Sequence, residues 1–126
     1  MLTSAPVFTT IPVTDLSVSK KFYQEQLGLQ QIPDPSTHGY MFMAGERTKL
    51  FIYRKDVWAK DEHVIAAFFV ENIAQSVDAL AKNGVEFLKS MKDVTLDEKG
   101  IATGEKEKAA WFVDPDRNVL SLSQFL

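Results

Sequence analysis

The 126-residue sequence predicts an α+β fold built from two copies of one unit, in which a strand and a helix precede three further strands. The first observation is an internal repeat, whose matching pairs are Val13/Val70, Asp15/Asn72, Leu16/Ile73, Ser19/Ser76 and Gly28/Gly84. The offset is 57 (70 − 13) for the first four pairs and 56 (84 − 28) for the glycines, so we expect the first helix to be about one residue longer. The second observation is that each copy has one apolar helical stripe between short apolar segments. Because one copy is too small to close a core, the two should pack together, with a ligand cleft between them.

The first copy is expected over residues 6–54 and opens with a strand at Val7–Val13, a segment rich in Val, Ile and Thr. Asp15 then offers a carboxylate to cap a helix over residues 16–27, and Gly28 stands where a left-handed residue ends a helix. The remaining strands, separated by a loop at 33–39 and a turn at 44–47, are expected at Leu29–Ile32, Tyr40–Met43 and Lys49–Arg54.

The second copy is expected over residues 64–125 and repeats this order. A strand at Val64–Val70 leads to a helix that Asn72 caps and Gly84 ends. The later strands are expected at Val85–Leu88, Ala109–Val113 and Val119–Phe125, with a tight turn at 114–118 before the last one. The charged segment 97–108 alternates in sign, which favours a solvated hairpin or loop over a partner-binding surface. If mobile, this segment would act as a lid over the cleft.

Composition limits the classes of function. A net charge of −3 and a pI near 5.3 give no electrostatic reason to expect nucleic acid. The chain has no cysteine, which excludes disulfides and thiol chemistry and favours a cytoplasmic location. No stretch approaches the roughly 18 consecutive apolar residues of a membrane span, and the first ten residues lack the features of a secretion signal.

Three segments together resemble the vicinal oxygen chelate (VOC) superfamily, the glyoxalase, bleomycin resistance protein and dioxygenase family: IPVTDLSVSKKFYQEQLGL, FFVENIAQSVDALAKNGVEF and AAWFVDPDRNVLSL. The resemblance implies a single domain over residues 1–126, with two βαβββ modules that curl into half-barrels. It also implies a homodimer with ligand sites inside or between the half-barrels. One departure is Arg117, where the family usually has glycine; either Arg117 adopts a less favoured backbone angle or Asn118 takes the left-handed position.

Metal-using members of this superfamily carry four His, Gln or Glu ligands on inward-facing strand positions. The resemblance places two of them seven residues before the helix caps and one seven residues after Asp114, and strand matching places the fourth at about Leu50. The four positions are Phe8, Leu50, Ile65 and Ser121. None is a credible metal ligand, because a divalent ion needs imidazole nitrogen or carboxyl or amide oxygen. We therefore expect neither a metal nor another cofactor.

A displaced metal site stays open as an alternative. His63 lies two residues before Ile65, so a strand bulge would bring it inward, where Glu71 and another carboxylate would have to complete the site. His38 falls in a loop. The sequence has no Gly-x-Ser-x-Gly elbow, no cysteine nucleophile and no phosphate-binding glycine loop. A paired-carboxylate acid/base site also stays open because Asp and Glu are plentiful, although nothing singles out one pair.

An apolar site in place of the metal points to a metal-free protein that binds a small apolar or aromatic molecule. Alternation along the strands places Phe68 under the helix and leaves Trp111 and Phe112 undecided. The aromatic set around the site also includes Phe51 and Trp58. The expected ligand-binding residues are Phe8, Thr10, Tyr40, Leu50, Tyr53, Ile65, Phe69, Trp111 and Ser121. The alternatives are a VOC-type enzyme with a displaced metal or metal-free acid/base chemistry, and a structural or regulatory dimer without a ligand.

Overall fold

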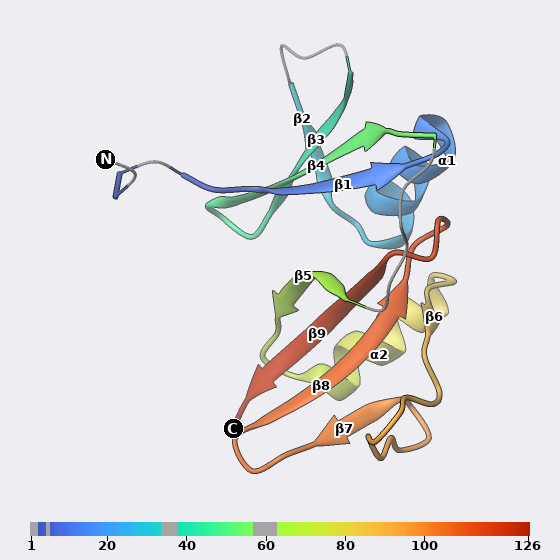
Figure 1. Cartoon of the computed structure of the whole chain (residues 1–126). Helices are drawn as coiled ribbons and strands as arrows, with labels where there is room; N and C mark the ends of the chain where they lie inside the picture. Colours follow the sequence, from blue (N-terminus) through green and yellow to red (C-terminus); the bar gives the residue numbers. More distant parts are fainter. Residues whose placement is uncertain (1–2, 5, 34–37, 57–62) are drawn as a thin grey trace. The chain divides into compact units, whose positions relative to one another are not determined.

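A computed structural model describes residues 3–4, 6–33, 38–56 and 63–126 of the chain. The chain forms two compact units, residues 1–59 and 60–126, and each contains one β-sheet with one helical segment (Figure 1). We refer to these units as module one and module two. Residues 34–37 of the predicted loop and Trp58 of the aromatic set lie outside the described residues.

Module one has the predicted order of a strand, a helix and three strands. Its elements are β1 (Thr9–Val13), α1 (Leu16–Lys21), the π-helical turn η1 (Phe22–Gln26), β2 (Gln30–Ile32), β3 (Gly39–Ala44) and β4 (Thr48–Arg54). The strand order is β1-β4-β3-β2, with β1 parallel to β4 and the other pairs antiparallel. The first strand is shorter than predicted, so Val7 and Phe8 precede it.

Module two repeats the arrangement with one additional strand. Its elements are β5 (Val64–Phe69), α2 (Ile73–Lys82), β6 (Glu86–Phe87), β7 (Ile101–Thr103), β8 (Glu107–Val113) and β9 (Val119–Phe125). The central strands are ordered β5-β9-β8, β5 runs parallel to β9, and both β6 and β7 pair with β8. The charged segment 97–108 therefore forms a hairpin through β7. The α+β class and the two βαβββ modules are confirmed.

Both helices begin at the residues predicted to cap them. Asp15 Oδ1 accepts hydrogen bonds from the backbone N–H groups of Ser17 and Val18, at 3.0 and 3.1 Å. Asn72 Oδ1 accepts one from the N–H of Gln75 at 3.1 Å. The hydrogen bond from the Val18 N–H, followed by that from the Ser17 hydroxyl, lowers the pKa of the Asp15 carboxyl below its usual 3.8. Each cap thus satisfies N–H groups that have no partner within the helix.

The one-residue difference between the two repeat offsets has a structural cause. After Lys21 the first helix continues as the π-helical turn η1, in which the N–H of Leu27 donates to the carbonyl of Phe22, five residues earlier. A π turn accommodates one more residue than the α-helix that it interrupts. The helix in module two is α-helical throughout, from Ile73 to Lys82. The longer first helix predicted from the sequence is therefore confirmed, and its extra residue is held in η1.

One face of each sheet is covered by the helix of its own module. In module one, Ile11, Phe42 and Ile52 are fully buried on this face, and the Phe42 ring lies 6.1 Å from the ring of Tyr23 in η1. In module two, the ring of Phe112 lies 6.4 Å from that of Phe68 and contacts other buried apolar side chains. The predicted position of Phe68 under the helix is confirmed. The opposite side of each sheet is called its open face below.

The turn between β8 and β9 keeps its shape without the glycine common in the superfamily. Arg117 itself adopts a left-handed backbone with φ of 68°, so of the two predicted possibilities Arg117, and not Asn118, takes that position. The Asp114 carboxylate accepts hydrogen bonds from the N–H groups of Asp116 and Asn118, both at 2.9 Å. The Arg117 guanidinium forms an ion pair with Glu86 at the surface. Within the described ranges, no helix has the length and apolar character needed to cross a membrane.

Candidate functional site

The open face of module two has small residues at its centre and aromatic residues around them. Side chains alternate along a strand, so the positions that alternate with buried Leu120, Leu122 and Phe112 point to the open face. Cross-strand register aligns Ala67 and Trp111 on either side of Ser121, and aligns Phe69 and Ala109 on either side of Ser123. The undecided choice between Trp111 and Phe112 is thereby settled, since Trp111 lies on the open face and Phe112 in the core.

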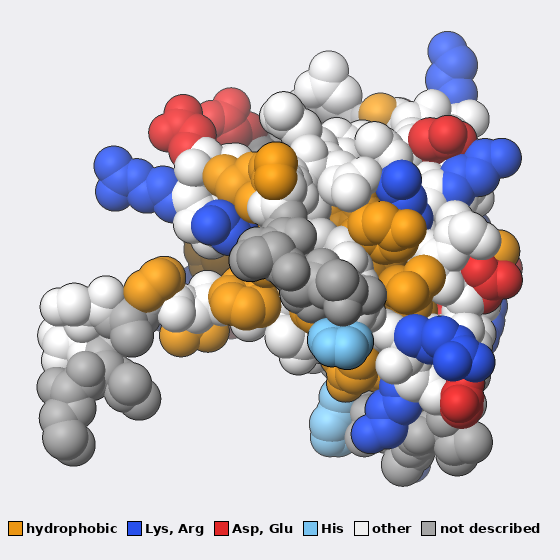
Figure 2. All heavy atoms as spheres, turned by 90° about the horizontal axis from the view of Figure 1, so that it is seen from above, with side chains coloured by type: hydrophobic (Ala, Val, Ile, Leu, Met, Phe, Trp, Pro, Cys, Tyr) orange, Lys and Arg blue, Asp and Glu red, His pale blue; other side chains and the backbone are white. Residues whose placement is uncertain are grey.

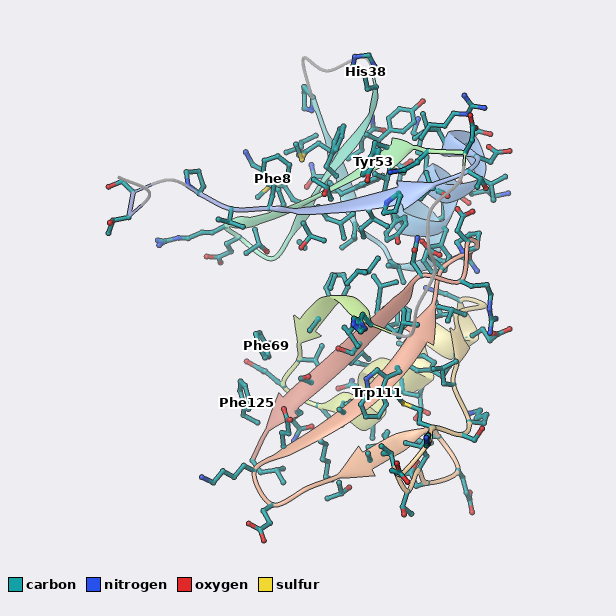
Figure 3. The ribbon with its side chains drawn as sticks, in the orientation of Figure 1. Phe8, His38, Tyr53, Phe69, Trp111 and Phe125 are labelled. Atoms are coloured by element: carbon teal, nitrogen blue, oxygen red, sulfur yellow. The ribbon has the colours of Figure 1, made fainter. Side chains whose placement is uncertain are left out.

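Phe69 and Phe125 form an exposed aromatic pair at the carboxyl ends of β5 and β9 (Figure 3). Their ring centroids are 5.1 Å apart and their planes are inclined by 30°. The side chains are 70% and 67% exposed, although a pair of this size would normally be buried. Ser121, at the centre of the same face, is only 5% exposed. The face therefore offers exposed ring surfaces at its end, whereas Ser121 at its centre is buried.

Module one has a second aromatic pair on its open face. Register places Thr10 and Met41 on either side of Phe51 on that face, and the next open-face residue along β4 is Tyr53. The rings of Phe51 and Tyr53 are 6.4 Å apart and nearly parallel, inclined by 12°. Gly39 lies against this strand, because a Cβ atom there would overlap the Ile52 carbonyl oxygen and would lie 2.8 Å from the tip of the Phe51 ring. Phe8 is partly exposed and precedes β1.

Two predicted ligand-binding residues lie on the wrong face of their sheet. Register aligns Tyr40 with Ile52, and Leu50 with Phe42, so both point to the helix-covered face. Leu50 is 2% exposed, and the Lys20 ammonium of α1 lies 4.8 Å from the centre of the Tyr40 ring. Neither residue therefore lies on the open face of its sheet, where we had expected it. Strand matching had placed the fourth metal position one residue too early, and a one-residue shift reverses the side of a strand residue.

Ile65 is placed by a strand irregularity that alternation does not describe. The pairing of β5 with β9 shifts between Val64 and Ala66, which makes Ile65 the extra residue of a β-bulge. The bulge anticipated near His63 is therefore present. Both histidines of the chain, His38 and His63, are exposed, and Figure 2 shows histidine side chains (pale blue) at the surface. Counting in twos along the strands identifies Thr10, Ala67 and Phe69 as open-face residues. Because Ile65 is the extra residue of the bulge, the same count does not settle the side on which Ile65 lies.

The register and the internal repeat together correct the fourth metal position. Ala67 and Thr10 correspond at the offset of 57, and their strand partners are Ser121 and Phe51. The counterpart of Ser121 is therefore Phe51 instead of Leu50. With this correction the four positions hold two phenylalanines, an isoleucine and a serine, which do not fit a divalent ion. Over the described residues, no group of three or more His, Cys, Asp or Glu side chains is placed to hold a metal.

Sequence reasoning did not name three residues of the open faces as ligand contacts. These residues are Met41, Phe51 and Phe125. Counting in twos from Ser121 leads to Phe125, so this signal was already present in the sequence. By contrast, Phe51 and Met41 required the register of module one. Of the predicted ligand-binding residues, the structure brings Thr10 and Tyr53 together on the open face of module one. It brings Phe69, Trp111 and Ser121 together on the open face of module two.

The electrostatics of the open face of module two favour binding of an uncharged group. At the described open-face positions of β5, β8 and β9, the one charged residue is Glu107, beside Phe125 at the end of the sheet. The carboxyls whose pKa is clearly lowered, Asp15 and Asp97, belong to a helix cap and to a turn. For Asp97 the main cause is the hydrogen bond from the Ile101 N–H. The open face of module two can therefore stack against an uncharged ligand, and the carboxyls with a clearly lowered pKa lie away from it.

Comparisons with known proteins agree on the fold. The family model described as Glyoxalase/Bleomycin resistance protein/Dioxygenase superfamily matches residues 6–122. A glyoxalase family protein from Bacillus anthracis superposes with a TM-score of 0.72 at 19% identity, covering 100% of both chains. One from Enterococcus faecalis gives 0.69 at 22% identity, covering 98% of this chain and 99% of that one. The fosfomycin resistance protein FosX from Listeria monocytogenes gives 0.67 at 19% identity, covering 96% and 90%. No curated protein sequence matches the chain.

Proposed function

The chain belongs to the glyoxalase/bleomycin resistance protein/dioxygenase superfamily, and we propose that it binds a small apolar or aromatic molecule without the metal that many members use. The observation that carries this proposal is the exposed Phe69–Phe125 pair next to Ser123 at the end of the open face of module two. Rings of this kind contribute large contact areas and stack well against planar molecules. Glu107 is the one charged residue at the described open-face positions of β5, β8 and β9, and its negative charge next to Phe125 disfavours an anionic ligand at this face.

The binding proposal is tested with Nile red, an uncharged planar dye whose fluorescence rises in apolar surroundings. We expect the full chain to bind the dye and Phe69→Ala or Phe125→Ala to weaken binding about tenfold, since each removes most of a ring contact. Both side chains are largely exposed, so the fold should survive their loss. Val94→Ala is the matched control, because it shortens an exposed apolar residue away from the pair. Unchanged affinity in both phenylalanine variants would contradict the proposal.

The metal-free part of the proposal rests on the four family positions. Loss of imidazole and carboxylate ligands should abolish most of the affinity for a divalent ion. The measurement is elemental analysis of protein purified without chelators, for which we expect Ni, Zn, Fe and Mn far below one ion per chain. Near-stoichiometric content of any of these metals would overturn the metal-free proposal. It would not affect the conclusion on ligand binding, which the Nile red measurement tests separately.

An enzyme with a displaced metal is the second candidate function, and the bulge at Ile65 next to His63 is the observation that favours it. If metal is found and this candidate function is correct, His63→Ala should lower the metal content of the protein. His38→Ala is the matched control and should leave the metal content unchanged. Both histidines are exposed, so neither change should disturb a core. Equal metal content in the two variants would remove His63 from the site.

We also propose that the chain forms a homodimer. The support is the position of β1 and β5 at the ends of their sheets, together with the exposed apolar side chain of Val64 at the start of β5. Strand edges and apolar surface of this kind are common pairing surfaces. Light scattering coupled to size exclusion should give twice the chain mass of 14.2 kDa. A single-chain mass at micromolar concentration would contradict this proposal.

A further inference from the structure

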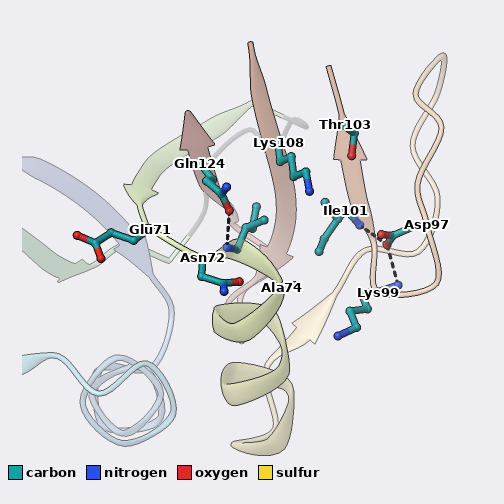
Figure 4. Close-up of a pocket in the computed structure, with 10 residues that line it drawn as sticks. Glu71, Asn72, Ala74, Asp97, Lys99, Ile101, Thr103, Lys108 and Gln124 are labelled. Carbon is teal, nitrogen blue, oxygen red and sulfur yellow. Dashed lines mark hydrogen bonds between the residues drawn. The ribbon is translucent and has the colours of Figure 1, made fainter. Parts of the chain in front are cut away.

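Module two contains a cavity of about 390 Å³ on the helix-covered side of its sheet (Figure 4). The segment that starts α2, the turn around Asp97 and residues of β7, β8 and β9 line it. Lys108 and Gln124 contribute from β8 and β9, and they alternate with Ala109 and Phe125 of the open face. The cavity is therefore distinct from the proposed site for an apolar ligand.

Three acceptor atoms on the polar walls of this cavity already accept hydrogen bonds from backbone N–H groups. Gln124 Oε1 accepts a hydrogen bond from the Ile73 N–H at 2.8 Å, and Asn72 Oδ1 accepts the one from Gln75. Asp97 Oδ1 accepts bonds from the N–H groups of Lys99 and Ile101, at 2.8 and 2.9 Å. The amide NH₂ groups of Gln124 and Asn72 remain available as donors. These side chains also occupy N–H groups at the start of α2, so the helix terminus itself is not the binding group.

One positive charge at this cavity lacks a partner. The ammonium of Lys99 is 2.7 Å from the carboxylate of Asp78 and is thus neutralised. Lys108 is half-buried, and no hydrogen bond or ion pair holds its ammonium within the described part of the chain. Glu71 also borders the cavity, but Figure 4 shows its carboxylate directed away from Lys108. A half-buried ammonium among donor groups favours an incoming anion.

We propose that this cavity binds the carboxylate of a small monoanionic molecule, with Lys108 as the charged contact and the amide of Gln124 as a neutral donor. A ligand with one negative charge fits this cavity better than a ligand with two, because Lys108 is the single uncompensated positive charge. The Asp97 carboxylate, which also lines the cavity, keeps its negative charge and would repel a second one. Ile101 and Ala74 supply aliphatic surface for a short hydrocarbon group. The volume lies within the range of small-molecule sites.

The test is an NMR titration of the ¹⁵N-labelled full chain with isobutyrate, its uncharged isostere isobutyramide, and inorganic phosphate. We expect isobutyrate to shift the amide signals of Ile101 and Thr103 in a saturable way, and isobutyramide to bind at least tenfold more weakly. Equal binding of isobutyramide, or tighter binding of phosphate, would overturn the proposed ligand class. This comparison uses the unaltered chain, so it decides the question even if a variant does not fold.

Two lysine variants then locate the site. Lys108→Met keeps most of the side-chain volume and should weaken isobutyrate binding about tenfold. Lys106→Met removes the same charge from the exposed end of the same hairpin, outside the cavity, and should leave binding unchanged. Equal effects of the two substitutions would show a general charge effect and overturn the site. Failure of this proposal would leave the Nile red result untouched.

Discussion

Replacing Ser19 by alanine should stabilise the protein, although the side chain lies in a well-packed core. Ser19 is 1% exposed on the inner side of α1, and its hydroxyl has no hydrogen-bond partner among the described residues. Burial of a hydroxyl without a partner costs about 1–3 kcal/mol, and alanine adds about 0.5 kcal/mol of helix propensity. Removal of the hydroxyl oxygen also removes some van der Waals contacts, which offsets part of this gain. We therefore expect Ser19→Ala to raise the free energy of unfolding by about 1–2 kcal/mol.

The internal repeat supplies a matched control for this substitution. Ser76 occupies the same position in α2, and both serines donate their backbone N–H to the capping residue, at 3.0 Å to Asp15 and 3.1 Å to Asn72. Ser76 is only partly buried, so Ser76→Ala removes no buried, unpartnered hydroxyl. We expect it to change the free energy of unfolding by no more than about 0.5 kcal/mol, from helix propensity alone.

Urea unfolding followed by circular dichroism measures both variants. At an unchanged slope against urea, the midpoint reports stability directly. For a chain of this length, Ser19→Ala should raise the melting temperature by about 4–8 °C. A Ser19→Ala variant that is no more stable than Ser76→Ala would refute the reasoning, because it would show that the hydroxyl makes a stabilising interaction in solution.

Four further substitutions test the turn, the helix cap and the two faces of module two. Arg117→Gly should raise the free energy of unfolding by up to about 1 kcal/mol. The reason is that relief of the left-handed backbone at residue 117 exceeds the loss of the exposed ion pair with Glu86. A lower free energy of unfolding in urea would contradict this. The lowered pKa of Asp15 contributes stability that is present above pH 3.8 and is lost as pH falls through the lowered value. Asp15→Asn should therefore flatten stability against pH in that window, and an unchanged profile would exclude this carboxyl as a source. Phe112→Ala should cost about 3–5 kcal/mol, whereas Trp111→Ala on the open face should cost much less; equal costs in thermal unfolding would contradict the assignment of faces.

Local signals were sufficient to predict the elements of the fold. Asp15 and Asn72 cap the helices as expected, because a short polar side chain before an apolar stripe acts within one turn of backbone. The repeat offset predicted the extra residue of the first helix, although its π-helical form was not visible in the sequence. The strand β7 was less clear, since three residues within a charged segment carry little apolar pattern.

The candidate site was predicted in part, and the errors share one cause. Phe69 and Ser121 lie on one open face, where alternation and the family motif place them, and register adds Trp111, whose side the sequence left undecided. Leu50 and Tyr40 were misplaced because strand matching was off by one residue in β4, and because alternation in β3 was not anchored to any known position. A shift of one residue moves a side chain through the sheet, so small errors of register become complete errors of face.

The amino-acid sequence by itself determined the duplicated α+β architecture, the capped helices and the loss of metal ligands at the family positions, because these depend on residue type and on spacing within a few turns or strands. Only the tertiary structure decided which aromatic rings are exposed, where β5 bulges at Ile65 and which lysine at the cavity of module two lacks a counter-charge. Those features depend on the pairing of strands far apart in the chain. Hydrogen-bonded register, which no local pattern specifies, sets that pairing.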